Sequence, residues 1–96
     1  MKEYFVYILA SKRNGTLYIG LTSNLIKRVY QHKKGFIKGF TKRYKVNKLV
    51  YYEQFDNINN TIKREKQLKK WKRQWKIELI EKNNPVWQDL YPKKIK

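Results

Sequence analysis

YFVYILASKRNGTLYIG, residues 4–20, contains two runs of β-branched and aromatic residues on either side of Asn14-Gly15. Runs of this composition are typical of strands that pack into a core. An Asn-Gly pair favours a tight hairpin turn, because such a turn needs positive φ at both central positions. The sequence therefore predicts an antiparallel hairpin over residues 4–20, with Tyr7 and Tyr18 on its two strands.

A helix and a third strand are predicted next. Thr22-Ser23-Asn24 offers side-chain oxygens for an N-cap, so the helix begins near Leu25, and Gly35 ends it. Residues 35–45 are rich in Gly, Lys and aromatic side chains, and we expect a mobile basic loop there. The run at residues 48–55 predicts the third strand.

Residues 61–82 have helical periodicity, with apolar side chains at separations that suit one helix face. One continuous helix and two helices with a break near Lys72-Arg73 both satisfy this pattern. Asn83-Asn84-Pro85 ends the helical region, because proline disfavours helix at the residue before it. Trp87 and Leu90 are expected to pack back on the core. The apolar positions are Ile62, Leu68, Trp71, Trp75 and Leu79.

The predicted order β-β-α-β-α indicates an α/β fold, in which a small three-stranded sheet, antiparallel or mixed, is flanked by helices. A chain of 96 residues has the size of one domain. We assign residues 1–92 to this domain and residues 93–96 to a basic frayed tail.

The charge balance is the first indication of function. Lys and Arg number 24 and Asp and Glu number 7, which leaves a net charge of +17. Repulsion on this scale opposes the compact state, so a partner that neutralises it is expected. Nucleic acid is the common partner, because phosphate neutralisation releases counterions. The alternative is a solvated, lysine-rich surface without a nucleic-acid partner.

Other function classes lack the residues they need. The absence of cysteine excludes disulfides, thiolate zinc sites and a cysteine nucleophile, and it suits a cytoplasmic protein. No apolar run approaches the ~20 residues of a membrane span, so we expect no membrane partner. The seven carboxylates are scattered, which speaks against a carboxylate-rich two-metal site. One carboxylate holding one Mg²⁺, with water and phosphate completing its shell, is the simpler alternative.

Five sequence elements in order resemble the GIY-YIG endonuclease superfamily, in particular its short stand-alone branch. Val6-Tyr7-Ile8 stands at the first motif, where the family has Gly-Ile-Tyr, and Tyr18-Ile19-Gly20 stands at the second. Arg28 and His32 match an R-x-x-x-H element, and Glu65 matches the single metal-binding glutamate. The segment NPVWQDL, residues 84–90, resembles the ending of that branch.

The resemblance implies roles for five residues. Tyr7 would be the general base or align the water, with positive neighbours favouring its phenolate. Tyr18 would orient water or phosphate, and Arg28 would contact the scissile phosphate with its planar fork of donors. His32 would shuttle a proton or bond a phosphate oxygen near pH 7. Glu65 would hold Mg²⁺, with Mn²⁺ as a substitute.

Each role has a structural alternative. Both tyrosines could be hairpin core residues, and His32 could be a surface residue near a helix end. Glu65 could form only a surface ion pair with Lys69, four residues on. Glu53 is a weaker candidate ligand that is expected to pair with a lysine, and Asn84 is a candidate for an asparagine that assists the site in some relatives.

Basic and aromatic side chains supply the predicted nucleic-acid contacts. Phe36, Phe40 and Tyr44 lie in the basic loop, where they could stack on unpaired bases. The three tryptophans Trp71, Trp75 and Trp87 are assigned to the core or to an interface. The predicted phosphate-contacting cations are Lys27, Lys33, Lys34, Lys38, Lys42, Arg43, Lys69 and Lys70.

These features predict a Mg²⁺-dependent endonuclease that acts on DNA with little intrinsic sequence specificity. We expect it to be a monomer or a weak dimer. The family chemistry implies 5′-phosphate and 3′-hydroxyl ends. RNA stays open as a substrate, and a protein partner could direct the domain to its target. The main alternative is a non-catalytic nucleic-acid-binding module on the same fold. A ribosomal or RNA-scaffold protein would explain the charge but not the set of Tyr, Arg, His and Glu.

Overall fold

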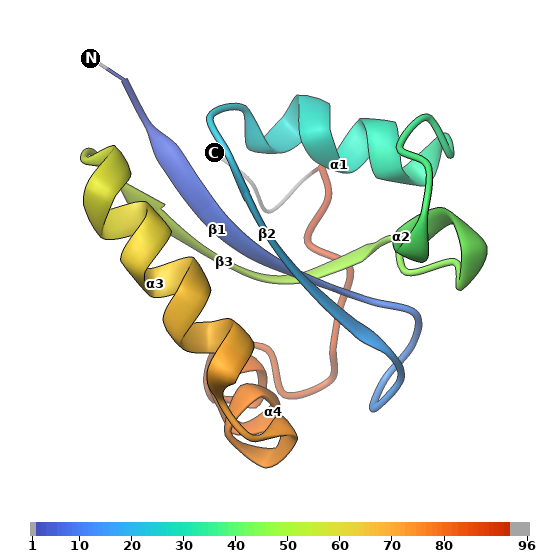
Figure 1. Ribbon diagram of the computed structural model, residues 1–96. Helices are drawn as coiled ribbons and strands as arrows, with labels where there is room; N and C mark the ends of the chain where they lie inside the picture. The colour runs from blue at the N-terminus through green and yellow to red at the C-terminus, as the bar shows by residue number, and fades with distance from the viewer. Residues whose placement is uncertain (1, 93–96) are drawn as a thin grey trace.

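The structure is a computed structural model that describes residues 2–92, so the predicted tail at 93–96 lies outside the described residues. Three strands form one antiparallel sheet in the order β2-β1-β3, with helices around it (Figure 1). The predicted fold class is therefore confirmed. The elements are β1 (Tyr4–Ala10), β2 (Leu17–Thr22), α1 (Leu25–Lys33), α2 (Phe40–Arg43), β3 (Lys48–Phe55), α3 (Ile58–Lys70) and α4 (Arg73–Asn83).

The β1–β2 hairpin forms as predicted, but its turn differs. Only Asn14 has positive φ, at 58°, whereas the predicted two-residue turn needs two such positions. The connection instead spans residues 11–16, where Gly15 N–H donates to Lys12 O at 2.9 Å. A Cβ at Gly15 would lie 2.4 Å from Ser11 Oγ, so a larger residue there would have to displace the Ser11 side chain.

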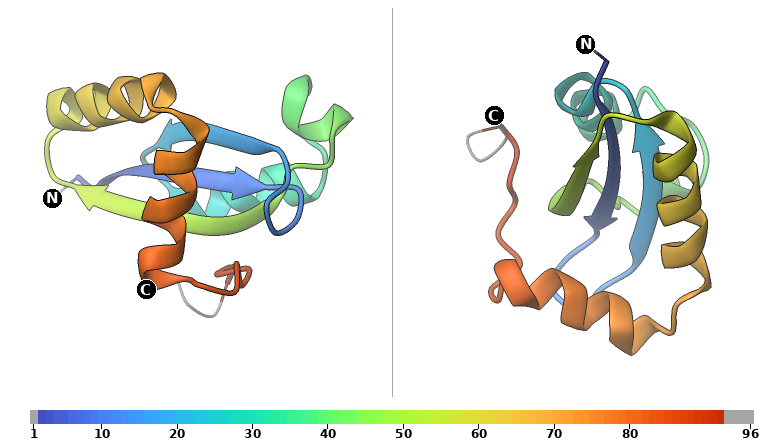
Figure 2. Two further views of the ribbon diagram at one scale, coloured as in Figure 1. Left: turned by 90° about the horizontal axis from the view of Figure 1, so that it is seen from below. Right: turned by 90° about the vertical axis from the view of Figure 1, so that its left-hand side faces the viewer.

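The central strand β1 supplies both faces of the core. Its side chains alternate, so Phe5, Tyr7 and Leu9 lie on the α1 face while Val6 and Ile8 lie on the opposite face. Figure 2 shows α1 and α3 on opposite sides of the sheet. The α1 face also contains Leu25, Val29, Val46 and Leu49, and the α3 face contains Ala10, Ile19, Val50, Leu68, Ile80 and Trp87.

The helical region at residues 61–82 is two helices. Trp71 and Lys72 have extended backbone, with ψ of 149° and 148°, and they separate α3 from α4 close to the predicted alternative break. Helix α3 also begins earlier than predicted, because the side chain of Asn57 accepts hydrogen bonds from Asn59 N–H and Asn60 N–H.

The predicted apolar face of this region is partly wrong. Leu68 is fully buried, but Ile62 is 37% and Trp75 is 48% exposed. Thr61 is buried instead of Ile62, with its hydroxyl donating to Asn57 O at 2.7 Å. Because the chain changes direction between α3 and α4, Trp75 does not lie on the same buried face as Leu68, as it would in one continuous helix.

The segment after α4 closes the molecule. Trp87 is 1% exposed in the α3-face core and Leu90 packs against the α1-face core, as predicted. Leu90 N–H donates to Leu49 O at 2.8 Å, and Asp89 Oδ1 accepts from Leu49 N–H at 3.2 Å. The segment therefore covers part of the outer edge of β3.

The predicted mobile loop at residues 35–45 contains the short helix α2. Gly39 at φ 106° precedes it and Lys45 at φ 55° follows it. Thr41, in its first turn, is 4% exposed. Within residues 2–92, no helix is both long and apolar enough to cross a membrane.

Candidate active site

Tyr7 lies at the middle of the sheet on the α1 face. Its side chain is 1% exposed, and its hydroxyl lies 3.1 Å from His32 Nε2. Burial raises the pKa of this phenol above its ordinary value, Tyr18 adds to the rise, and the charge and hydrogen bonding of Arg28 oppose it. Arg28 therefore favours the phenolate, as predicted for a positive neighbour, but desolvation of the buried phenol outweighs this attraction and the net effect is a raised pKa.

Gly20 makes room for Tyr7. The two residues are opposite each other in the β1–β2 pair. A Cβ built on Gly20 would lie 2.4 Å from the hydroxyl oxygen of Tyr7 and 2.5 Å from Cζ. The glycine of the second motif is thus required by the position of the tyrosine in the first.

Tyr18 and His32 complete a cluster of three rings. Ring centroids are 6.3 Å apart for Tyr7 and Tyr18, and 5.6 Å apart for Tyr18 and His32. Tyr18 is half-buried and packs against the α1-face core. The tyrosines therefore pack as hairpin residues and also meet the predicted histidine.

His32 connects Tyr7 to α2. Its ring is 5% exposed, and its Nδ1 lies 3.0 Å from Thr41 Oγ1. Burial and the nearby charge of Arg28 lower the pKa of His32 to about 4, so the imidazole is neutral at pH 7. The expectation of a proton shuttle or phosphate ligand that titrates near pH 7 is therefore corrected, since both ring nitrogens have partners inside the protein.

Arg28 and Glu65 approach this cluster from different helices. Arg28 is half-buried one turn before His32 on α1, and its positive charge acts on both Tyr7 and His32. Glu65 on α3 is near enough for its charge to raise the pKa of Tyr7. A shallow pocket beside Arg28 is lined by polar and cationic side chains, which suits a phosphate group: Thr22, Ser23, Asn24, Lys27, Arg28 and Gln31.

Glu65 is the carboxylate that the structure offers for a metal. Its side chain is 19% exposed and lies 3.2 Å from Lys69 Nζ, so the predicted ion pair is present. Within residues 2–92, no three or more His, Cys, Asp or Glu side chains gather as a metal site. This donor set fits Mg²⁺, which binds one or two carboxylates and completes its shell with water and substrate phosphate. It does not fit zinc, which needs three or four protein ligands.

Asn84 and Lys33, both predicted for the functional surface, have structural roles. Asn84 is buried, and its Nδ2 donates to Val50 O at 3.1 Å and to Gln88 O at 2.8 Å. Val50 falls at an irregularity in the β1–β3 register, and its carbonyl accepts the hydrogen bond from Asn84. Lys33 Nζ forms a salt bridge with Asp89 and donates to Asn47 O at 2.9 Å. Both assignments are therefore corrected, because the polar groups hold the C-terminal segment in place.

Glu53 is also occupied. Its carboxylate accepts from Arg64 Nη2 at 2.8 Å and from the hydroxyl of Tyr51. The partner is thus an arginine on α3, where a lysine was expected. Arg64 Nε also donates to both carboxylate oxygens of Glu53. Glu53 is therefore not available to bind a metal.

Sequence reasoning missed Gly20 and Thr41 as parts of the site. Gly20 stood inside the second motif, whereas no local signal marked Thr41, whose importance depends on the fold of residues 35–45. The other predicted cations are exposed and able to meet a polyanion: Lys27, Lys34, Lys38, Lys42, Arg43, Lys69 and Lys70.

The fold and the candidate residues together define a class: a small α/β domain in which a β-hairpin carries two tyrosines, a helix on one side of the sheet carries an arginine, and a helix on the other side carries a glutamate whose charge acts on Tyr7. The sequence model described as "GIY-YIG catalytic domain" matches residues 3–78. The chain belongs to the GIY-YIG family, and its fold is of the endonuclease type.

Relatives agree with this assignment. The chain is 39% identical over 84 residues to a UPF0213 protein of Syntrophus aciditrophicus, covering 86% of this chain and 95% of the relative. It is 37% identical over 91 residues to a UPF0213 protein of Clostridium perfringens, covering 95% and 96%. The solution NMR structure of a UPF0213 protein from Bacillus halodurans superposes with a TM-score of 0.57 at 22% identity, over 93% of this chain and 94% of that one. The last similarity supports the fold.

Proposed function

We propose that this domain is a Mg²⁺-dependent endonuclease that hydrolyses phosphodiester bonds in DNA with little intrinsic sequence specificity. The observation that supports this most is that Tyr7 packs beside Tyr18 and is acted on by the charges of Arg28 and Glu65, which come from two further elements. Phosphodiester hydrolysis needs an oriented water and relief of the charge that develops on phosphorus. A binding module has no need of a mostly buried glutamate at the same place.

Tyr7 acts in its neutral form. We assign to the buried imidazole the tautomer in which His32 Nε2 accepts from the Tyr7 hydroxyl and Nδ1–H donates to Thr41 Oγ1, an assignment that both distances allow. Of the two lone pairs of the Tyr7 oxygen, one accepts from Arg28, and the other is available to accept a hydrogen bond from the attacking water. Because burial raises the pKa of Tyr7, this orienting role replaces that of a preformed phenolate base.

Arg28 and Tyr18 position the phosphate. The guanidinium of Arg28 presents several donors in one plane, which suits two oxygens of one phosphate. Tyr18 is half-buried, so its hydroxyl can reach either the water or a phosphate oxygen. Glu65 would hold Mg²⁺ after releasing Lys69, and a bound Mg²⁺ supplies charge neutralisation at the phosphate.

The +17 net charge supports DNA as the partner, since it provides sequence-independent attraction to phosphates. The exposed cations that were predicted to contact phosphates lie on α1, α2 and α3 and on the segment between α1 and α2. Contacts of this kind position a protein on DNA without reading the sequence.

The decisive experiment compares Glu65→Gln with Glu78→Gln. Glu78 is an exposed glutamate on α4 whose partner is Gln74, so it is a matched control for loss of one negative charge. Plasmid and oligonucleotide cleavage is measured with Mg²⁺, Mn²⁺ or EDTA. We expect Glu65→Gln to abolish cleavage while binding DNA equally well or slightly more tightly, and Glu78→Gln to cleave normally. Normal cleavage by Glu65→Gln would contradict the proposal.

The ion pair between Glu65 and Lys69 favours a second candidate, a nucleic-acid-binding module without catalysis. In that case Glu65 contributes only a surface interaction of about 0.2–0.5 kcal/mol. No substrate in the panel would then be cut with either metal, although DNA would still bind.

A further inference from the structure

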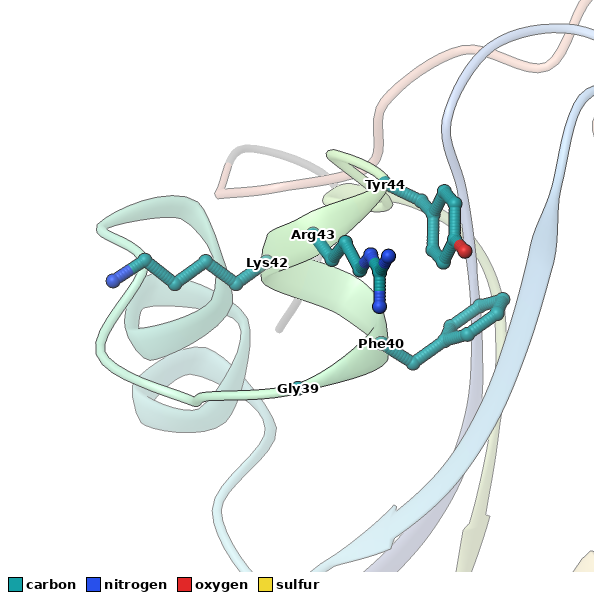
Figure 3. A pocket seen from close by; sticks show the side chains of 5 residues that line it. All are labelled: Gly39, Phe40, Lys42, Arg43 and Tyr44. Carbon is teal, nitrogen blue, oxygen red and sulfur yellow. The ribbon is translucent and has the colours of Figure 1, made fainter.

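Two large exposed rings lie at α2, Phe40 at its first residue and Tyr44 directly after its last. Phe40 is 47% and Tyr44 is 50% exposed, and their centroids are 5.0 Å apart. Tyr44 N–H donates to Phe40 O at 3.0 Å, so one helical turn fixes their spacing. Together with Gly39, Lys42 and Arg43 they line an open pocket (Figure 3). Exposed paired rings at a pocket are typical of a binding site rather than of a core.

This pair continues the rings of the candidate active site. Phe40 and Tyr18 lie nearly parallel, with centroids 6.5 Å apart and an interplanar angle of 26°. The residue after Phe40 is Thr41, whose buried hydroxyl bonds to His32. The position of α2 is therefore tied to the residues that hold Tyr7, and the outer rings lie at a fixed place relative to the site.

The charge around the rings is positive. Residues 35–45 contain no Asp or Glu. The guanidinium of Arg43 lies 5.7 Å from the Tyr44 ring centroid. In Figure 3 the side chains of Arg43, Phe40 and Tyr44 extend to the same side of α2, whereas Lys42 extends to the other. A flat aromatic group joined to an anion, as in a nucleotide, matches flat rings beside a guanidinium.

We propose that α2 forms a stacking subsite for an unpaired nucleobase of single-stranded DNA, next to the phosphate that the domain cleaves. In a duplex the faces of the bases are covered by their neighbours, so a protein ring reaches a base face only when the base has left the stack. The substrates of the domain are then DNA strands that are unpaired at the cleavage point. This inference rests on the proposed function for the position of the cleaved phosphate.

Binding in EDTA tests the subsite without catalysis. The probes are a fluorescein-labelled single strand and the blunt duplex of the same length, measured by anisotropy. Leucine keeps an apolar side chain and helix propensity while removing the ring. Each of Phe40→Leu and Tyr44→Leu should weaken single-strand binding by about 5- to 100-fold, as removal of one stacking ring does. Duplex binding should change by less than about twofold, because phosphate contacts remain.

Trp75→Leu is the matched control. Trp75 is 48% exposed and has Lys72 Nζ 5.4 Å from its ring centroid, so it also presents a ring beside a cation. It lies on α4, outside the proposed subsite, and its replacement should leave both affinities unchanged. Phe40→Trp keeps a large ring and should retain single-strand binding. A strand carrying 2-aminopurine should lose fluorescence on binding to the wild type and not to Tyr44→Leu, which reports stacking directly.

Equal losses for single strand and duplex, or no loss in either leucine variant, would overturn the subsite. The outcome is separate from that of the proposed function. If the wild-type protein cleaves DNA but binds the single strand no more tightly than the leucine variants do, the subsite alone is refuted. A protein that shows the ring-dependent preference yet cuts nothing with Mg²⁺ supports the subsite and refutes the nuclease.

Discussion

Replacing Gly20 by alanine tests the packing that positions Tyr7. The new methyl group would lie 2.4 Å from the hydroxyl oxygen of Tyr7 and 2.5 Å from Cζ. Atoms in favourable contact lie about 3.5–4.0 Å apart, so the ring would have to move by about 1 Å. The Tyr7 side chain is 1% exposed and bonded to His32, so it has no free space to enter.

The expected cost is large for a domain of this size. Overpacking costs about 1–3 kcal/mol, and losing the bond between Tyr7 and His32 would add about 1 kcal/mol. A domain of 60–100 residues loses roughly 4–8 °C of Tm per kcal/mol, so Gly20→Ala should melt about 10–25 °C lower. Cleavage should fall by about 100-fold or more, since a displacement of about 1 Å at a reacting group has that effect.

The assay is thermal unfolding followed by circular dichroism, repeated in a Tyr7→Leu background. Leucine lacks the three atoms nearest to the new methyl group, which all belong to Tyr7. Gly20→Ala should then be neutral or stabilise by about 0.5–1 kcal/mol, because alanine loses less entropy in a strand than glycine. If Gly20→Ala costs the same in both backgrounds, Tyr7 does not occupy the space beside Gly20 and the reasoning is refuted.

Four further predictions concern ionisation, positioning and charge. Tyr7→Phe should lower kcat by about 10²–10⁴ and change stability by no more than about 1 kcal/mol; full activity in a folded protein would exclude an orienting role. His32 is the one histidine of the chain, and its pKa is lowered from 6.5 to about 4 in the folded state. Between pH 4 and pH 6.5 the imidazole is therefore protonated in the unfolded state and neutral in the folded state. Stability should therefore decrease as pH falls from 6.5 toward 4, by up to about 1.4 kcal/mol per pH unit, and His32→Gln should flatten this part of a urea-denaturation series. Thr41→Val should lower kcat and leave KM nearly unchanged, whereas Thr41→Ser, which keeps the hydroxyl, should retain the wild-type kcat. An equal loss of kcat in the two variants would leave Thr41 a packing residue. Reversing the charge at Lys69 and Lys70 should weaken binding of all DNA sequences alike and reduce the salt dependence of affinity; a sequence-selective loss would contradict this.

Local patterns were sufficient for the sheet and for the pairing of the two motif tyrosines. Strand composition and the Asn14-Gly15 turn are local signals, and a hairpin brings Tyr7 and Tyr18 together without information from elsewhere in the chain. The helix that carries Arg28 and His32 was also predicted from a local signal, and its Asn24 cap forms as expected. The site residues themselves were named by the resemblance to the GIY-YIG family, and short-range order explains why Tyr7 meets Tyr18 and why Arg28 and His32 share one helix.

Features that depend on tertiary packing could not be predicted in this way. The break at Trp71 and Lys72 has no proline or glycine to mark it, and the two helices differ in how they pack on the sheet. The charge count suggested that Tyr7 would ionise easily, but charge near a residue says nothing about its burial, which decides the direction here. The role of Asn84 required knowledge of the register irregularity at Val50.

The segment after α4 also determines what the outer edge of β3 offers to other molecules. Leu49 has both backbone groups engaged there, by Leu90 N–H and by the carboxylate of Asp89. An edge strand with free backbone groups is a template on which a second chain can add a strand. A chain shortened before Asp89 would therefore be prone to self-association through β3, and loss of solubility with increasing protein concentration would accompany its loss of stability.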